Sequence, residues 1–218
     1  MLIVVNTVLF GQERVTRIRA FLLLFPYSST SLIQRIFFSF PSGERKCRKI
    51  LADMAATGLV RRFMFGEYLY YIGKRSAQWK HQHGMTRFHF DLFFSLRKPQ
   101  EIVYRKVEYV YPQGRADALY ILKLHEDGRG VKFFLEWDDG LNEFDKIGKY
   151  EEYAKGREWK NEFWADPLKA GRCIFPQVLI VSERQIDVRS ETLAVKLCKP
   201  GSNYLEVLTG GNRQVSSK

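Results

Sequence analysis

Residues Arg115–Tyr150 read R-A-D-A-L-Y-I-L-K-L-H-E-D-G-R-G-V-K-F-F-L-E-W-D-D-G-L-N-E-F-D-K-I-G-K-Y, and they are the most informative part of the chain for predicting its fold. Two apolar segments flank D-G-R-G, a sequence typical of a tight hairpin turn at 127–130. We therefore expect strands at 116–124 and 131–137. Asp117 lies at the start of the first strand and Glu136 at the end of the second. Antiparallel pairing would bring these two carboxylates close together.

The segments around this hairpin predict a mixed α/β (α+β) domain. Apolar residues recur at helical spacing over 85–96, and residues 102–111 alternate as a strand. A second helix is expected over 141–155, and a buried strand over 177–181. The order of helix, three strands, helix and strand is similar to the core of the PD-(D/E)xK nuclease-like fold. In that fold, the second and third strands carry metal-binding acids side by side.

That resemblance implies a catalytic site with a divalent ion. Asp117 and Glu136 would bind Mg²⁺ or Mn²⁺ through oxygen ligands, and the ion would polarise a phosphodiester and activate water. Asp138 stands where the nuclease pattern expects a lysine, which is a departure from the pattern. Lys146 or Lys149, on the following helix, could supply the missing cation.

Two other interpretations of the acids remain open. Asp117, Glu136 and Asp138 could satisfy backbone groups, cap the following helix or pair with cations such as Arg115 and the two helix lysines. The domain could also be a degenerate nuclease fold that is kept for binding. The sequence does not separate these interpretations from the catalytic one.

The first third of the chain follows the order of a winged helix-turn-helix. Helices are expected at 13–25, 30–38 and 43–57, and a hairpin of two short strands at 59–63 and 68–72. In that geometry, the third helix presents its N-terminal half to the major groove of DNA.

Positive charge is concentrated in this same segment. Residues 1–75 contain 12 Lys and Arg against 4 Asp and Glu, whereas the whole chain has 35 against 24. A basic surplus of this kind favours a polyanionic partner, duplex DNA above all. We expect six cations to carry the contact: Arg45, Lys46, Arg48, Lys49, Arg61 and Arg62. The alternatives are a winged helix used for protein contacts and a basic face that is merely solvated.

Both blocks together resemble the replication-relaxation family of plasmid and mobile-element proteins. The segment R-K-I-L-A-D-M-A-A-T-G-L-V-R-R is similar to the end of that family's winged helix. Asp117-Ala118, Phe134-Leu135-Glu136-Trp137-Asp138 and Lys146 to Tyr150 are similar to its later block D-A, F-L-E-x-D and K-x-x-x-Y. The resemblance covers residues 13–182. It implies DNA binding in plasmid replication, copy control or mobilisation, without assured enzymatic activity.

The expected organisation has five parts: an arm at 1–12, a winged helix at 13–75, a linker at 76–85, the nuclease-like domain at 86–209 and a disordered tail at 210–218. Within the last domain, 192–197 and 204–208 are expected as short strands. Three cysteines without a C-x-x-C pair favour a reducing cytoplasm. No apolar run reaches the length of a membrane span, so we expect no membrane partner.

The function expected from the sequence is duplex DNA binding in plasmid or mobile-element maintenance, with a homodimer allowed. One alternative is a Mg²⁺- or Mn²⁺-dependent endonuclease that uses Asp117, Glu136, Asp138 and a helix lysine. The other is a transcriptional regulator whose second domain mediates assembly.

Overall fold

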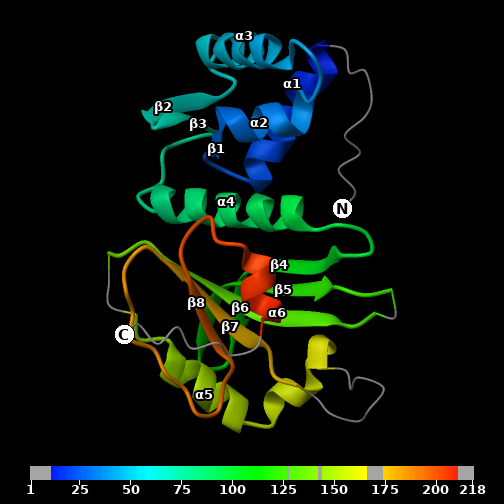
Figure 1. The fold of residues 1–218 in the computed structure, drawn as a ribbon. Coiled ribbons are helices and arrows are strands. Elements are labelled where there is room, and N and C mark those ends of the chain that lie inside the picture. Colours follow the sequence, from blue (N-terminus) through cyan, green and yellow to red (C-terminus); the bar gives the residue numbers. More distant parts are fainter. Residues whose placement is uncertain (1–10, 127, 142–143, 166–173, 211–218) are drawn as a thin grey trace, which may run out of the picture. The chain divides into compact units, whose positions relative to one another are not determined.

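The computed structural model describes residues 11–126, 128–141, 144–165 and 174–210 (Figure 1). It is a mixed α+β structure with two compact units, Met1–Arg87 and Phe88–Lys218. The expected arm at 1–12 and tail at 210–218 lie almost entirely outside the described residues. Among the described residues, no helix is both long enough and apolar enough to cross a membrane.

The first unit combines three helices with a small sheet (Figure 1). Its elements are α1 (Gly11–Leu24), β1 (Ser28–Ser29), α2 (Thr30–Phe37), α3 (Gly43–Ala56), β2 (Arg61–Phe65) and β3 (Glu67–Tyr71). The sheet order is β1-β3-β2 and both pairings are antiparallel. The three helices and the hairpin match the sequence expectation, whereas the two-residue strand β1 carries no periodic signal and was not expected.

The core of this unit explains why the helices form where they do. Ile18 and Leu22 on α1, Ile33 on α2, and Leu51 on α3 are all at most 1% exposed. Burying each such side chain contributes about 1.5–3 kcal/mol, so the apolar spacing selects the inward face of each helix. Ser29 caps α2, because its hydroxyl oxygen accepts the Leu32 N–H at 3.2 Å.

Helix α4 (Trp79–Ser95) begins six residues earlier than expected. The segment predicted as a linker is therefore helical from Trp79 onward. The reason is tertiary: the Trp79 ring packs edge-on against Phe63, with ring centroids 4.8 Å apart. His83 Nδ1 also lies within hydrogen-bond distance of the Tyr27 carbonyl oxygen, at 2.8 Å. The boundary between the two units falls inside this helix, between Arg87 and Phe88.

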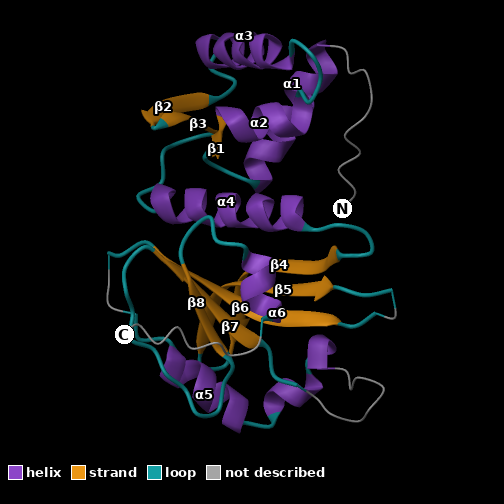
Figure 2. Cartoon of the chain, viewed as in Figure 1, coloured by secondary structure: helices purple, strands orange, loops and turns teal. Residues whose placement is uncertain are grey.

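The second unit is built on one mixed sheet (Figure 2). Its strands are β4 (Glu101–Tyr111), β5 (Gly114–Lys123), β6 (Gly130–Asp138), β7 (Gln177–Ser182) and β8 (Val195–Cys198), in that spatial order. Strands β4, β5 and β6 pair antiparallel, and β6, β7 and β8 pair parallel. The strands expected around the hairpin are present, although Asp127 of the expected turn lies outside the described residues.

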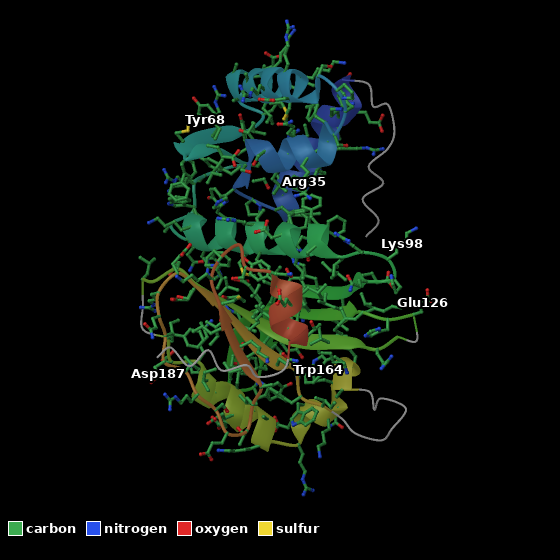
Figure 3. The ribbon with its side chains drawn as sticks, viewed as in Figure 1. Arg35, Tyr68, Lys98, Glu126, Trp164 and Asp187 are labelled. Carbon is green, nitrogen blue, oxygen red and sulfur yellow. The ribbon has the colours of Figure 1, made fainter. Side chains whose placement is uncertain are left out.

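Aromatic side chains pack on both faces of this sheet. Trp164, labelled in Figure 3, packs against Phe134 of β6 on one of them. On one face lie α5 (Ile147–Lys155) and the short helices η1 (Glu158–Asn161) and η2 (Phe163–Ala165). There, Phe134 of β6 packs against Tyr150, with ring centroids 5.2 Å apart. On the other face, Phe88 of α4 packs against Tyr120 of β5 and against Tyr204 of α6 (Tyr204–Thr209).

Three further expectations differ from the structure. The helix expected over 141–155 begins at Ile147, and residues 142–143 lie outside the described part of the chain. The segment 204–208, expected as a strand, belongs to the helix α6. The Asn203 side chain accepts the Glu206 N–H at 3.3 Å and so caps this helix, and Tyr204 and Leu208 bury the same face. The strand expected at 192–197 is the shorter β8.

Candidate functional site

The first half of α3 carries four exposed cations, which we call the basic face: Arg45, Lys46, Arg48 and Lys49. The opposite side of the helix is anchored by Cys47, Leu51 and Met54, each at most 2% exposed. This division follows from the helical period, because residues four and seven positions apart lie on one side. All four cations are exposed, and the DNA contact expected from the sequence for these residues stays a prediction.

The start of α3 is held close to the preceding chain. A Cβ atom on Gly43 would lie 1.9 Å from the Phe38 carbonyl oxygen, so only glycine fits there. Arg48 pairs with Glu44 at 2.6 Å, but both side chains are more than half exposed, and such a pair adds little stability. The charges of the basic face therefore remain at the surface.

The hairpin adds Arg61 and Arg62, which are exposed on β2, at one edge of the three-stranded sheet. The Arg62 guanidinium lies 4.3 Å from the centroid of the Tyr68 ring. These two residues follow the C-terminal end of α3, whereas the basic face lies at its N-terminal end. The two groups are thus separated by roughly 15 Å of helix.

In the second unit, two strands bring Asp117 and Glu136 together, and we call these residues the acid pair. Ala118 of β5 lies opposite Leu135 of β6, which sets the acids side by side as the sequence predicts. Asp117 Oδ2 accepts the Trp137 N–H at 2.7 Å, and its Oδ1 lies 3.4 Å from Lys146 Nζ. The Lys146 ammonium also contacts Glu136 Oε2, and the Tyr150 hydroxyl donates to Glu136 Oε1.

The acid pair is strongly perturbed by its surroundings. Glu136 is 1% exposed, and burial, reinforced by the Asp117 charge, raises its pKa to about 8. Lys146 and Tyr150 act in the opposite direction. Burial by itself disfavours the charged form of Lys146, but the carboxylates of Glu136 and Asp117 outweigh it and raise the lysine pKa.

Asp138 belongs to a separate ion pair. Its two carboxylate oxygens accept from Arg184 Nε at 2.7 Å and from Nη2 at 2.9 Å. The Ser182 hydroxyl donates to Oδ2 at 2.6 Å. Burial raises the pKa of Asp138, but the hydrogen bonds from Arg184 and Ser182 outweigh burial and lower it. The residue in the usual lysine position is therefore neutralised by its own arginine.

Of the two candidate lysines, only Lys146 reaches the acid pair in the described structure. Lys149 is exposed, and the aliphatic part of its side chain lies beside Gly114. Sequence reasoning did not assign Tyr150 or Arg184 to the site. Tyr150 could have been found, because it lies four residues after Lys146 and hence on the same helix face. Arg184 follows β7 in an irregular segment, and no local pattern marks it.

The acid pair does not fit a divalent ion in this arrangement. Mg²⁺ and Mn²⁺ need oxygen ligands with accessible lone pairs, arranged about the ion in roughly octahedral geometry. Each of the four carboxylate oxygens here already faces a donor: Trp137, Tyr150 or Lys146. Within the described ranges, no group of three or more His, Cys, Asp or Glu side chains is placed to hold a metal ion.

No protein-family model, no curated protein and no solved structure matches this chain. The chain is a mixed α+β protein of two units. One unit exposes a basic helix, and the other encloses an acid pair bridged by a lysine.

Proposed function

We propose that the chain binds duplex DNA through a winged helix formed by residues 13–75. The order of α1, β1, α2, α3, β2 and β3 supports this proposal, as does the sheet order β1-β3-β2. In this arrangement α3 is the recognition helix and the β2–β3 hairpin is the wing. Gly66, at a φ of 69°, makes the tight turn at the hairpin tip.

The observation that carries the proposal is the basic face of α3. Its four cations occupy the N-terminal half of the helix, the part that enters the major groove in helix-turn-helix proteins. Arg61 and Arg62 lie beyond the other end of the helix, where they could contact the phosphates that flank the groove. If these cations only kept the surface solvated, nothing would place them both on α3 and on the hairpin that follows it.

For the second unit we propose the nuclease-like arrangement without catalysis. The order of α4, three antiparallel strands, α5 and the parallel strand β7 supports this arrangement. The Lys146 ammonium, which already contacts both acids, favours a binding role over an endonuclease. The resemblance to replication-relaxation proteins suggests a cytoplasmic role in plasmid or mobile-element replication, copy control or mobilisation.

The test is a salt titration of duplex DNA binding, measured by fluorescence anisotropy with the full chain. For a contact with four to six phosphates, the logarithm of the affinity should fall with the logarithm of salt at a slope of about −4 to −5. Replacing Arg45, Lys46, Arg48 and Lys49 together by alanine should reduce the magnitude of that slope by about 3 to 4.

The matched control replaces four exposed cations of the second unit by alanine: Lys155, Arg157, Lys160 and Lys199. This variant has the same net charge as the first, so non-specific loss of charge affects both equally. We expect the control to keep most of its affinity. Equal losses in the two variants would contradict the assignment of the basic face.

A further inference from the structure

The β2–β3 hairpin of the first unit ends in a group of exposed apolar and aromatic side chains, which we call the apolar tip. Its members are Met64, 59% exposed, Phe65, 51% exposed, and Tyr68, 38% exposed. Tyr68 is labelled in Figure 3. Single exposed apolar residues are ordinary on a protein surface, but three within five residues of one turn indicate a contact surface. Phosphate contacts by the neighbouring arginines do not account for them.

The inner face of the hairpin supports this tip. Phe63 lies on that face, and its ring packs edge-on against Trp79, with centroids 4.8 Å apart. The Phe65 ring lies 4.9 Å from the same indole, and the Arg75 guanidinium lies 3.8 Å from the centroid of Phe63. Met64 points to the opposite face, because successive side chains of a strand alternate. The tip is therefore held from one side and exposed on the other.

The charges beside the apolar tip are positive. Met64 lies opposite Tyr68 in the register of the two strands, and the Arg62 guanidinium lies 4.3 Å from the centroid of the Tyr68 ring. Glu67 is the only acidic residue between positions 59 and 72. Its carboxylate accepts hydrogen bonds from the Ser31 N–H at 2.9 Å and the Ser31 hydroxyl at 2.8 Å. The surface therefore suits a partner whose flat apolar groups are flanked by anions, as stacked bases are by phosphates.

We propose that the apolar tip enters the minor groove of duplex DNA and that Met64, with Phe65 beside it, acts as a wedge at one base step and kinks the duplex. Met and Phe are among the side chains that proteins insert between base steps, and such wedges kink DNA by about 20–90°. Arg62 would contact the adjacent phosphates. This inference rests on the proposed DNA binding and adds a distortion of the DNA to it.

The experiment measures how fast DNA ligase closes a short duplex into a ring. A fragment of about 120 base pairs is shorter than the persistence length of DNA, about 150 base pairs, so it closes slowly unless a bound protein kinks it. At concentrations that saturate the fragment, the full chain should accelerate closure on the order of tenfold. Fluorescence anisotropy with the same fragment measures binding separately.

The test variant replaces Met64 and Phe65 together by serine, which removes the apolar tip without changing the net charge. Its affinity should stay within about fivefold of the wild type, because phosphate contacts dominate affinity, whereas ring closure should return to the rate of free DNA. The matched control replaces Leu23 and Leu24 of α1, 69% and 54% exposed, by serine. The control should bind DNA and accelerate ring closure as the wild type does. Circular dichroism during heating checks that both variants are folded.

Wild-type binding without faster ring closure would overturn this inference, whatever the variants do, and would leave the proposed function intact. No binding of the fragment at all would overturn the proposed function itself. Equal ring closure by the wild type and the Met64 and Phe65 variant would also refute the wedge. If the wild type, but not this variant, sedimented with vesicles of phosphatidylserine and phosphatidylcholine while ring closure was unchanged, the tip would belong to a membrane contact instead.

Discussion

At the scale of single residues, the chemistry of the second unit depends on which cation meets which acid. Glu136 and Asp138 are two positions apart on β6, yet Glu136 contacts Lys146 and Asp138 contacts Arg184. The sequence placed the acid pair correctly, because the hairpin pairing follows from the apolar pattern. The sequence does not show whether Lys146 or Lys149 contacts the acid pair. Both lie near the start of α5, and the answer depends on where this helix begins.

The burial of Glu136 predicts a pH dependence of stability. Its pKa is about 8 in the folded protein, above the ordinary value of 4.5. The folded state therefore binds a proton more tightly than the unfolded state, and stability falls as pH rises from about 4.5 through 8. Glu136→Gln should flatten this fall, as measured by urea unfolding at several pH values. Glu158→Gln, at an exposed position, serves as the control, and an unchanged slope in Glu136→Gln would refute the assignment.

At the scale of elements, apolar periodicity predicted α1, α2 and α3, because each has one buried stripe. It failed at α4 and α6 for different reasons. The start of α4 is stabilised by contacts of Trp79 and His83 with distant residues, which no local window contains. Residues 204–208 form a short apolar run that is compatible with either a strand or a helix, and the Asn203 cap selects the helix.

Helix α3 illustrates how a buried stripe and a basic face share one element. Leu51 is fully buried, so Leu51→Ala should lower the free energy of unfolding by about 2–5 kcal/mol. Arg45→Ala, on the exposed face of the same helix, should change it by no more than about 0.5 kcal/mol. Chemical denaturation of both variants checks this difference. Similar losses in the two would mean that the basic face contributes to the core.

At the scale of the whole molecule, the first unit extends beyond the limit of 75 that the sequence predicts. Trp79, His83 and Thr86 of α4 all contact residues of the first unit, and Thr86 donates to the Pro26 carbonyl at 2.9 Å. The sequence assigns 76–85 to a linker, because these residues lack a clear apolar period. The contacts, and not the local pattern, define where this unit ends.

Truncation tests that boundary. A fragment of residues 11–87 should unfold at a higher Tm than a fragment of residues 11–75, because the shorter one lacks the contacts of Trp79, His83 and Thr86. Each kcal/mol lost should lower the Tm by about 4–8 °C for a fragment of this size. Circular dichroism during heating measures the difference. Equal melting temperatures would show that α4 adds nothing to the first unit.

The amino-acid sequence alone predicts most of the helices and strands of this protein, the charge of its first third and the adjacency of Asp117 and Glu136. These features depend on the side-chain period, the composition and a hairpin between neighbouring strands. The packing of the folded chain brings Lys146 to the acid pair and Arg184 to Asp138. The Lys146–Asp117 and Arg184–Asp138 contacts join residues 29 and 46 positions apart. They need α5 to pack on the sheet and β7 to pair with β6.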